Sequence, residues 1–362
     1  PVPLSAEDGL PRNGAHRLAA ALAVRCHVAV VAQEGPGGRW DDAWFHAHGF
    51  PLEERNALLR AWASIKRADA AVVVLWSPVE AAWDAIEAEV DAEMPVVSRR
   101  TVALPRAGFD ELVHDMYAFD WGPRTGENIA RKVALLADHA PRVRVLFAER
   151  PADAAPTLAR DLKLRLRERF AALSPVDRFT TLHVSESEAE TRHLMAIFAS
   201  ANNLRWLAHR RTPRAELLER LAGMRERAAR LGFCADDCCV VGASVLDALG
   251  LRAADDLDFT LRSALRTAHF DAGVTRLGPA LDVVSRNYPR SFTEAPAIDD
   301  DRMIDDPGCH FLVRGVGFAG PRIVMTRKKH QRRDKDLRDV ALLSDWFERI
   351  GLAWPALPAD GR

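Results

Sequence analysis

Several common features are scarce or missing in this chain of 362 residues. No apolar run approaches the ~20 residues that cross a bilayer, and the first twenty residues lack the basic start and apolar core of a signal peptide. Basic and acidic side chains balance, with 50 Lys and Arg against 51 Asp and Glu, which leaves a net charge of −1. We therefore expect a cytoplasmic protein without membrane insertion. A nucleic-acid partner is compatible with the sequence but is not indicated by its charge.

Cysteine and lysine are also rare. The five cysteines are an odd number at irregular spacings, which does not fit a disulfide framework. Cys234, Cys238 and Cys239 have no matching second pair for zinc, so buried thiols are the favoured interpretation.

Six of the 50 basic residues are lysine and 44 are arginine, and three of the six lysines lie in residues 328–335. A site that needs a compact ammonium cannot simply use the planar guanidinium of arginine. Chance clustering on a solvated helix is the alternative interpretation.

Short β-branched runs alternate with helical patterns in the first half of the chain. Residues 70–76 (AAVVVLW) are almost continuously apolar, which is typical of a strand buried on both faces. The predicted strands cover residues 27–33, 70–76, 96–104, 142–147 and 179–184, and the predicted helices cover residues 51–66, 79–90, 108–116, 127–139 and 157–172. This alternation predicts an α/β layered domain with a largely parallel sheet.

A strong helical pattern follows and then breaks. Ser185 and Glu188 have the spacing of a capping box at the start of a helix that runs to about residue 201. Residues 210–214 (RRTPR) are polar and contain proline, which favours a domain boundary there. Residues 215–231 form an amphipathic pattern rich in Arg and Glu.

The segment of residues 239–261 carries the most specific chemistry. It predicts a strand, a turn of small residues (Gly242-Ala243-Ser244), a short helix and a second strand containing Asp256-Leu257-Asp258. Residues i and i+2 of a strand face the same side, so the two carboxylates project together. Oxygen ligands of this kind suit Mg²⁺, and a small-residue turn before a helix lets the chain approach a phosphate.

This pattern resembles the nucleotidyltransferase fold of the DNA polymerase beta superfamily, and is most similar to bacterial minimal and abortive-infection nucleotidyltransferases. The family often ends in a helix with an Arg…Lys-Asp…Asp signature, which residues 333–339 match. Residues 311–318 and the helix around residues 328–329 are similar to the segment before it, so that the resemblance covers about residues 215–350. A weaker similarity links residues 117–122 and 183–203 to uncharacterised proteins encoded among bacterial surface-polysaccharide genes.

The resemblance implies roles for individual residues. Asp256 and Asp258 would hold Mg²⁺ or Mn²⁺, and a third carboxylate, for which Asp282 between apolar neighbours is the best candidate, would complete a two-metal site. The residues implied in binding nucleotide phosphates are Gly242, Ser244, Arg252, Lys328, Lys329, Arg333 and Lys335.

Some features leave alternatives open. Ala243 stands where many family members carry a second glycine or the serine, so the small residue that touches phosphate is undecided. Residues 299–301 and 305–306 are acidic rivals of Asp282 with the look of solvated loops. The alternating charges of residues 333–339 also fit a solvated helix face on which Lys335 pairs with Asp339.

We therefore expect an α/β (α+β) protein: an N-terminal α/β layered domain in residues 1–209 that binds the acceptor or a partner, a nucleotidyltransferase-like domain in residues 210–352, and a tail in residues 353–362. The expected reaction is metal-dependent transfer of a nucleotidyl group from a nucleoside triphosphate to an acceptor. One alternative is a glycosyl- or phosphoribosyl-type transferase of surface-polysaccharide biosynthesis that uses an activated sugar donor. Another is a nucleotide-sensing module without catalysis.

Overall fold

A computed structural model describes most of the chain and divides it into two compact units, Pro1–Arg55 and Asn56–Arg362. The described residues are 2–7, 27, 29–35, 42–118, 125–174, 177–210, 213–269, 274–278, 280–284 and 298–352. Helices and strands alternate along both units, which confirms the predicted α/β class.

The first unit is small. Strand β1 (Val2–Ser5) pairs in parallel with β2 (Val30–Gln33), which is the second half of the strand predicted from residue 27. Helix α2 (Asp42–Ala47) follows, and α3 (Leu52–Lys66) begins within this unit. Arg55 of α3 holds Asp42 of α2 in an ion pair of 2.7 Å.

The first sheet of the larger unit has four strands in the order β4-β5-β3-β6, and every neighbouring pair is antiparallel. Its strands are β3 (Ala70–Trp76), β4 (Val96–Ala103), β5 (Arg142–Glu149) and β6 (Leu182–Val184). The prediction of a largely parallel sheet is therefore wrong for these strands.

The reason lies in the crossovers. Helix α4 (Trp83–Glu93) joins β3 to β4, and α7 (Leu158–Arg169) joins β5 to β6. Each crossover passes over one strand, so the two strands that it joins share a direction but are separated by an antiparallel neighbour. This is a split βαβ arrangement.

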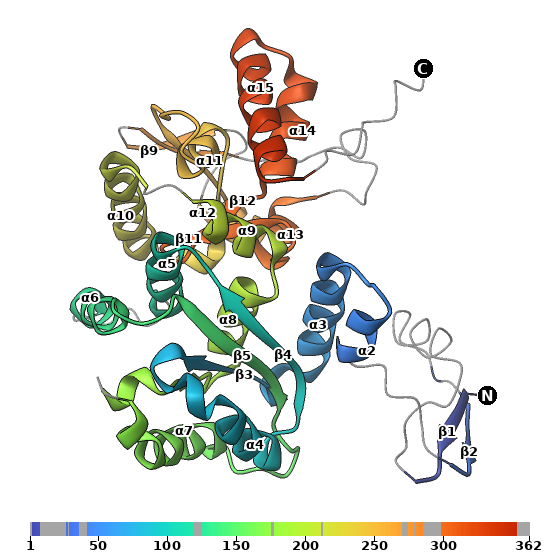
Figure 1. The fold of residues 1–362 in the computed structure, drawn as a ribbon. Helices are drawn as coiled ribbons and strands as arrows, with labels where there is room; N and C mark the ends of the chain where they lie inside the picture. The colour runs from blue at the N-terminus through green and yellow to red at the C-terminus, as the bar shows by residue number, and fades with distance from the viewer. Residues whose placement is uncertain are drawn as a thin grey trace. The chain divides into compact units, whose positions relative to one another are not determined.

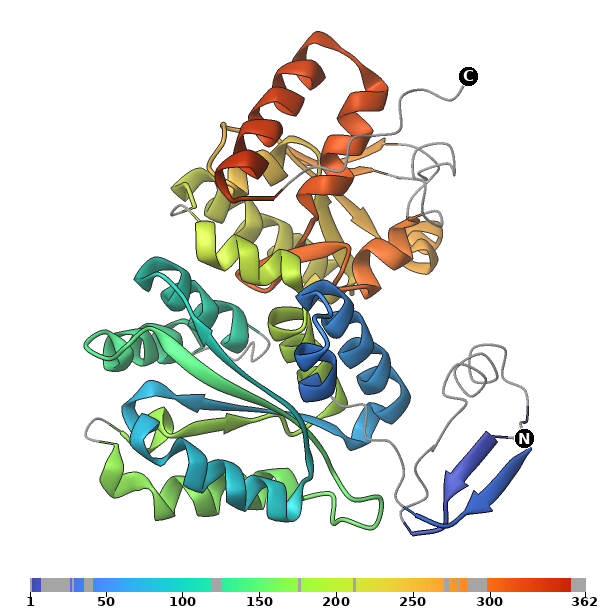
Figure 2. The ribbon, with the colours of Figure 1, turned by 45° about the vertical axis from the view of Figure 1, so that its right-hand side comes forward.

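Helices cover both faces of this sheet (Figures 1 and 2). Helices α4 and α7 pack on one face, with Trp83, Ile86 and Leu162 against Val73 of β3. Helices α5 (Arg106–Tyr117) and α8 (Glu188–Phe198) supply apolar side chains to the core on the other face. All seven residues of β3 are buried, as its apolar run predicts.

The second sheet is mixed and has six strands in the order β11-β12-β7-β8-β10-β9. They are β7 (Cys238–Val241), β8 (Leu257–Leu261), β9 (Val274–Gly278), β10 (Leu281–Val284), β11 (His310–Val313) and β12 (Val316–Ala319). The helices of this half are α10 (Ala215–Arg230), α11 (Ala243–Ala248), α12 (Ser263–His269), α13 (Asp300–Asp305), α14 (Pro321–Gln331) and α15 (Asp334–Arg349).

One hydrophobic core joins the two sheets. It runs from Val72 and Val74 of β3 to Phe311 of β11 and Phe318 of β12. Between them lies α9 (Ala201–His209), whose Trp206 ring lies 5.5 Å from that of Phe311. Among the helices that the structure describes, none is long and apolar enough to cross a lipid bilayer.

The cap of α8 differs from the prediction. Ser187, not Ser185, caps the helix, and its side chain accepts a hydrogen bond from the Glu190 backbone N–H. The hydroxyl of Ser185 instead accepts from the backbone N–H of Val72 at 2.9 Å, because this serine is fully buried beside β3. The predicted capping pair of Ser185 and Glu188 is therefore wrong by two residues.

Candidate metal centre

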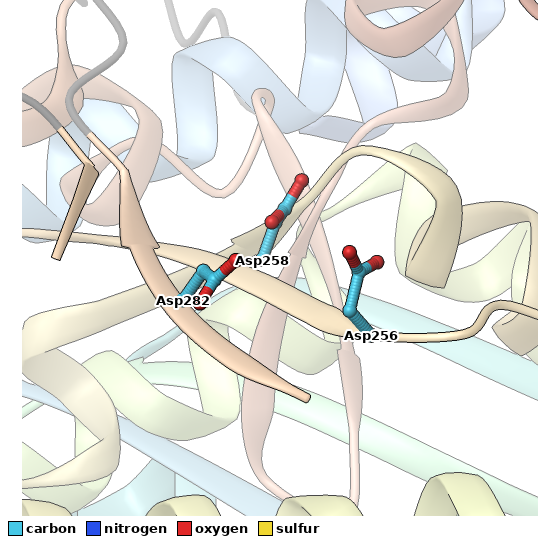
Figure 3. A group of neighbouring side chains, drawn as sticks. All are labelled: Asp256, Asp258 and Asp282. Carbon is cyan, nitrogen blue, oxygen red and sulfur yellow. The ribbon is translucent and has the colours of Figure 1, made fainter. Parts of the chain in front are cut away.

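Three carboxylates meet on neighbouring strands of the six-stranded sheet. Strands β8 and β10 run parallel, and their register places Asp282 directly beside Asp258. Asp256 immediately precedes β8, two residues before Asp258 and therefore on the same face. One side-chain oxygen of each lies within 4.8 Å of the others, and all three residues are partly exposed (Figure 3).

The local sequence produces this arrangement through the period of a strand. Leu257 and Phe259 of β8 and Leu281 and Val283 of β10 are buried in the core. The aspartates alternate with these apolar residues, so burial of one face holds the carboxylates on the other. The strands are short, and a shift of one residue would send the carboxylates into the core.

Gly242 lies against this cluster. It connects β7 to α11 with a φ of +73°, a conformation that residues with a side chain rarely adopt. A Cβ at this position would lie 2.9 Å from Oδ2 of Asp258. The glycine therefore gives the backbone a close approach to the carboxylates that no other residue allows. Ala243 is the first residue of α11.

Ser244 supports the cluster from behind. The serine is 1% exposed, and its hydroxyl donates a hydrogen bond of 2.7 Å to the backbone carbonyl oxygen of Asp256. This bond ties the start of α11 to the loop that ends in Asp256. The serine side chain is thus engaged with the protein, while its role toward phosphate stays a prediction.

Two of the predicted phosphate-binding cations lie in a network of ion pairs. Arg252 binds both carboxylate oxygens of Asp339 on α15, at 2.5 and 2.8 Å. Lys328 of α14 is buried and contacts Asp339 at 2.5 Å and Asp336 at 3.3 Å. Burial raises the pKa of Asp339, but hydrogen bonds from Arg252 and Lys328 outweigh it and hold that pKa below its usual value.

The charge of Arg333 interacts with the carboxylate cluster. Its side chain is 55% exposed and forms an ion pair with Asp336. The hydrogen bond with Asp336 is the main cause of a raised Arg333 pKa, and the charge of Asp258 adds to it. The turn between α14 and α15 therefore places a partly exposed cation within electrostatic reach of the cluster.

The charged segment at the start of α15 is only partly a solvated face. Lys335 is exposed, whereas Asp336 and Asp339 are buried. Asp339 pairs with Arg252 and Lys328, so the alternative interpretation, in which it pairs with Lys335, is wrong. The sequence does indicate that the two aspartates are buried, because Asp336, Asp339 and Leu343 fall on one helix face at intervals of three and four residues.

The acidic rivals of Asp282 have structural partners. Asp299 caps α13 by accepting a hydrogen bond from the Arg302 backbone N–H at 2.7 Å. Asp301 accepts from both the backbone and the hydroxyl of Ser263. Within the described ranges, the three aspartates of β8 and β10 are the only group of three or more His, Cys, Asp or Glu side chains that could hold a metal ion.

Comparison with known proteins adds nothing to this geometry: no protein-family model, no curated protein and no solved structure matches the chain.

Proposed function

We propose that the protein transfers a nucleotidyl group from a nucleoside triphosphate to an acceptor in a metal-dependent reaction. The observation that carries the proposal is the convergence of Asp258 and Asp282, on two strands in register, with Asp256 just before β8, their oxygens lying within 4.8 Å of one another. Gly242 beside them supports it, since it keeps the backbone open to a substrate at the same point.

The donor set fits Mg²⁺ or Mn²⁺. Hard divalent cations prefer carboxylate oxygens and are commonly bound by one or two carboxylates together with substrate phosphates. Three negative side chains on one face repel one another, and a divalent cation among them would relieve that repulsion. When bound, such an ion supplies positive charge to the phosphates and orients the attacking and leaving oxygens.

In the proposed reaction, an acceptor oxygen forms a bond to the α-phosphorus. The bond from that phosphorus to the oxygen bridging the β-phosphate breaks, pyrophosphate leaves, and the acceptor proton passes to water. Asp256, Asp258 and Asp282 would hold the cation, and Gly242 would leave room for the phosphates. Arg333 would balance their charge, with Lys335 beside it on the exposed side of α15.

Arg252 and Lys328 have a different proposed part. Arg252 pairs with Asp339, and Lys328 pairs with both Asp336 and Asp339. They would therefore position the hairpin of α14 and α15 rather than touch phosphate. Through this network the hairpin holds Arg333 in place.

The test is release of pyrophosphate from each nucleoside triphosphate, with Mg²⁺ or Mn²⁺ and a mixture of candidate acceptors. Asp256→Asn should abolish release, while Asp255→Asn changes an exposed carboxylate only one residue away and should leave it intact. Equal activity in the two variants would refute the proposal.

Binding measurements separate the alternatives. A ligand present at 100 times its Kd raises the free energy of unfolding by about 2.7 kcal/mol, which shifts the thermal midpoint visibly. Metal-dependent consumption of a sugar diphosphate would instead favour a glycosyl- or phosphoribosyl-type transferase. Tight nucleotide binding without turnover would favour a sensing module.

A further inference from the structure

A second candidate site lies in the other half of the larger unit. A cavity of about 580 Å³ is lined by side chains from α5, α6 (Thr125–Leu136), α7, β6 and α8 and from residues 177–179. Cavities of this size hold small organic ligands in other proteins. None of the lining residues belongs to the six-stranded sheet, so the cavity is separate from the carboxylate cluster.

The carboxylates around the cavity each lie beside a basic side chain. Arg131 pairs with Asp177 at 3.1 Å, and Lys163 forms an ion pair with Glu186. His183 lies 2.9 Å from the carboxylate of Glu190. Each of these carboxylates therefore already has a basic partner.

Two cations remain. Lys132 is 7% exposed, donates a hydrogen bond to the backbone carbonyl oxygen of Phe179, and lies over the Trp76 ring at 4.8 Å. The guanidinium of Arg167 donates to the carbonyl oxygen of Leu182 at 2.9 and 3.0 Å. In the described part of the chain, neither cation forms an ion pair with a carboxylate.

Each cation lies over a different aromatic ring of the cavity wall. Lys132 lies 5.9 Å from the centre of the Tyr117 ring, and Arg167 lies 5.3 Å from that of Phe179, a ring whose residue is 45% exposed. Met116 and Ile129 add apolar wall. The cavity therefore combines two basic groups that lack a carboxylate partner among the described residues with surfaces suited to an apolar or aromatic group.

Without a ligand, burial of Lys132 and Arg167 disfavours their charged forms. Burial, followed by repulsion from Arg167, lowers the pKa of Lys132 to about 7, and the carboxylate of Asp177 only partly offsets this. Burial also lowers the pKa of Arg167. Burial lowers the pKa of His183 more than the hydrogen bond and charge of Glu190 raise it. An anion between the two cations would remove the cost.

We propose that this cavity binds a small organic anion, with its phosphate or carboxylate group between Lys132 and Arg167 and its apolar part against Phe179, Met116 and Ile129. The site lies apart from the carboxylate cluster and would bind its ligand whether or not the nucleotidyl-transfer proposal is right.

The first test is titration calorimetry of the full chain at pH 6.5 with phenyl phosphate, benzoate, inorganic phosphate and, as the uncharged control, benzyl alcohol. We expect at least one of the two aromatic anions to bind and benzyl alcohol to bind at least tenfold more weakly. Binding of phenyl phosphate alone would identify a phosphate ester as the ligand, and binding of benzoate alone a carboxylate. Absence of binding by both aromatic anions at millimolar concentration would overturn the proposal.

Variants assign the binding to the two cations. Lys132→Met keeps the length of the side chain and its apolar stem, and Arg167→Gln keeps hydrogen-bond donors; each should weaken the anion at least tenfold. Asp256→Asn in the carboxylate cluster should leave the affinity unchanged. Retained affinity in both Lys132→Met and Arg167→Gln would overturn the proposal.

A second readout does not depend on variants that fold. With six lysines in the chain, selective ¹⁵N and ¹³C labelling of lysine gives few enough side-chain signals to assign. The Lys132 signal should titrate near neutral pH, and the bound anion should raise that pKa by at least one unit, since it stabilises the ammonium form. A titration of Lys132 that is unaffected by a saturating anion would overturn the proposal.

Discussion

The two halves of the larger unit concentrate opposite charges by different means. On the six-stranded sheet, three carboxylates meet because two short strands alternate aspartate with core residues in matching register. Beside the four-stranded sheet, Lys132 and Arg167 meet on two helices that are separated in the chain by all of β5. In the first site a local pattern sets the face on which each aspartate lies and strand pairing brings them together, whereas the second site depends on helix packing alone.

The interactions that hold the side chains of the two sites in place differ as well. A buried network of ion pairs braces the helices next to the carboxylates. The cations of the cavity rely on backbone carbonyl oxygens and aromatic rings instead. The predictions below separate these supports, from the largest expected effect to the smallest.

The network beside the carboxylates should contribute most to stability. Asp339→Ala leaves Arg252 and Lys328 without their shared partner, which we expect to lower the free energy of unfolding by about 3–5 kcal/mol. Urea unfolding measures it. Glu226→Ala on α10 removes an exposed pair with Arg230 and should cost less than about 1 kcal/mol. Similar losses in both variants would contradict the importance of the network.

Asp258→Asn should separate the two sites functionally. Loss of a direct ligand should lower the rate of nucleotidyl transfer by more than the about 10- to 100-fold that loss of an outer partner costs. The affinity of the cavity for phenyl phosphate or benzoate should not change. Rate assays and calorimetry on one preparation compare the two, and a parallel loss of both activities would show that the sites are not independent.

Gly242→Ala tests the close approach beside Asp258. The strained backbone conformation and the contact at 2.9 Å should together lower the free energy of unfolding by about 1–3 kcal/mol. Gly223→Ala in α10 is the matched control, since its added Cβ meets nothing within 4 Å and should stabilise the helix by about 0.5–1 kcal/mol. Thermal unfolding should show shifts of opposite sign, and equal shifts would refute the crowding at Gly242.

The buried Lys132 should make stability depend on pH. Its pKa is about 7 in the folded chain against an ordinary value of 10.5, so between these values the unfolded chain holds a proton that the folded chain lacks. Stability therefore rises with pH across this window, by up to about 1.4 kcal/mol per pH unit.

Urea unfolding at pH 7.5 and pH 9 measures the rise in the free energy of unfolding. The same measurement on Lys132→Met gives the contribution of all other groups, which is subtracted. The variant should gain less stability between the two pH values than the natural chain. An equal gain would contradict the lowered pKa.

Local patterns predicted a large part of the molecule. The α/β class follows from the alternation of strand and helix patterns, and the buried strand at residues 70–76 follows from its continuous apolar run. Asp282 is the best candidate because of its apolar neighbours, but the expectation that a third carboxylate lies beside Asp256 and Asp258 comes from the family resemblance. Strand direction is not local, because the same alternation of strands and helices results whether or not a crossover passes over a strand.

Other features could not be predicted from the sequence, because they too depend on non-local packing. Ser187 and Ser185 are equivalent as caps in sequence, and burial of Ser185 beside Val72 decides between them. Lys132 carries only one hint in the sequence, which is that a chain with so few lysines has retained one inside an amphipathic helix. Its pairing with Arg167 depends on how α6 and α7 pack.

The apolar core that runs from β3 to β12 has a consequence for how the larger unit melts. Because residues of both sheets fill the same interior, neither sheet can lose its structure without exposing apolar surface of the other. Residues 56–362 should therefore unfold cooperatively, in a single calorimetric transition whose van't Hoff and calorimetric enthalpies agree. A fragment beginning at residue 210 should correspondingly expose the side of β11 that α5, α8 and α9 cover, and should aggregate.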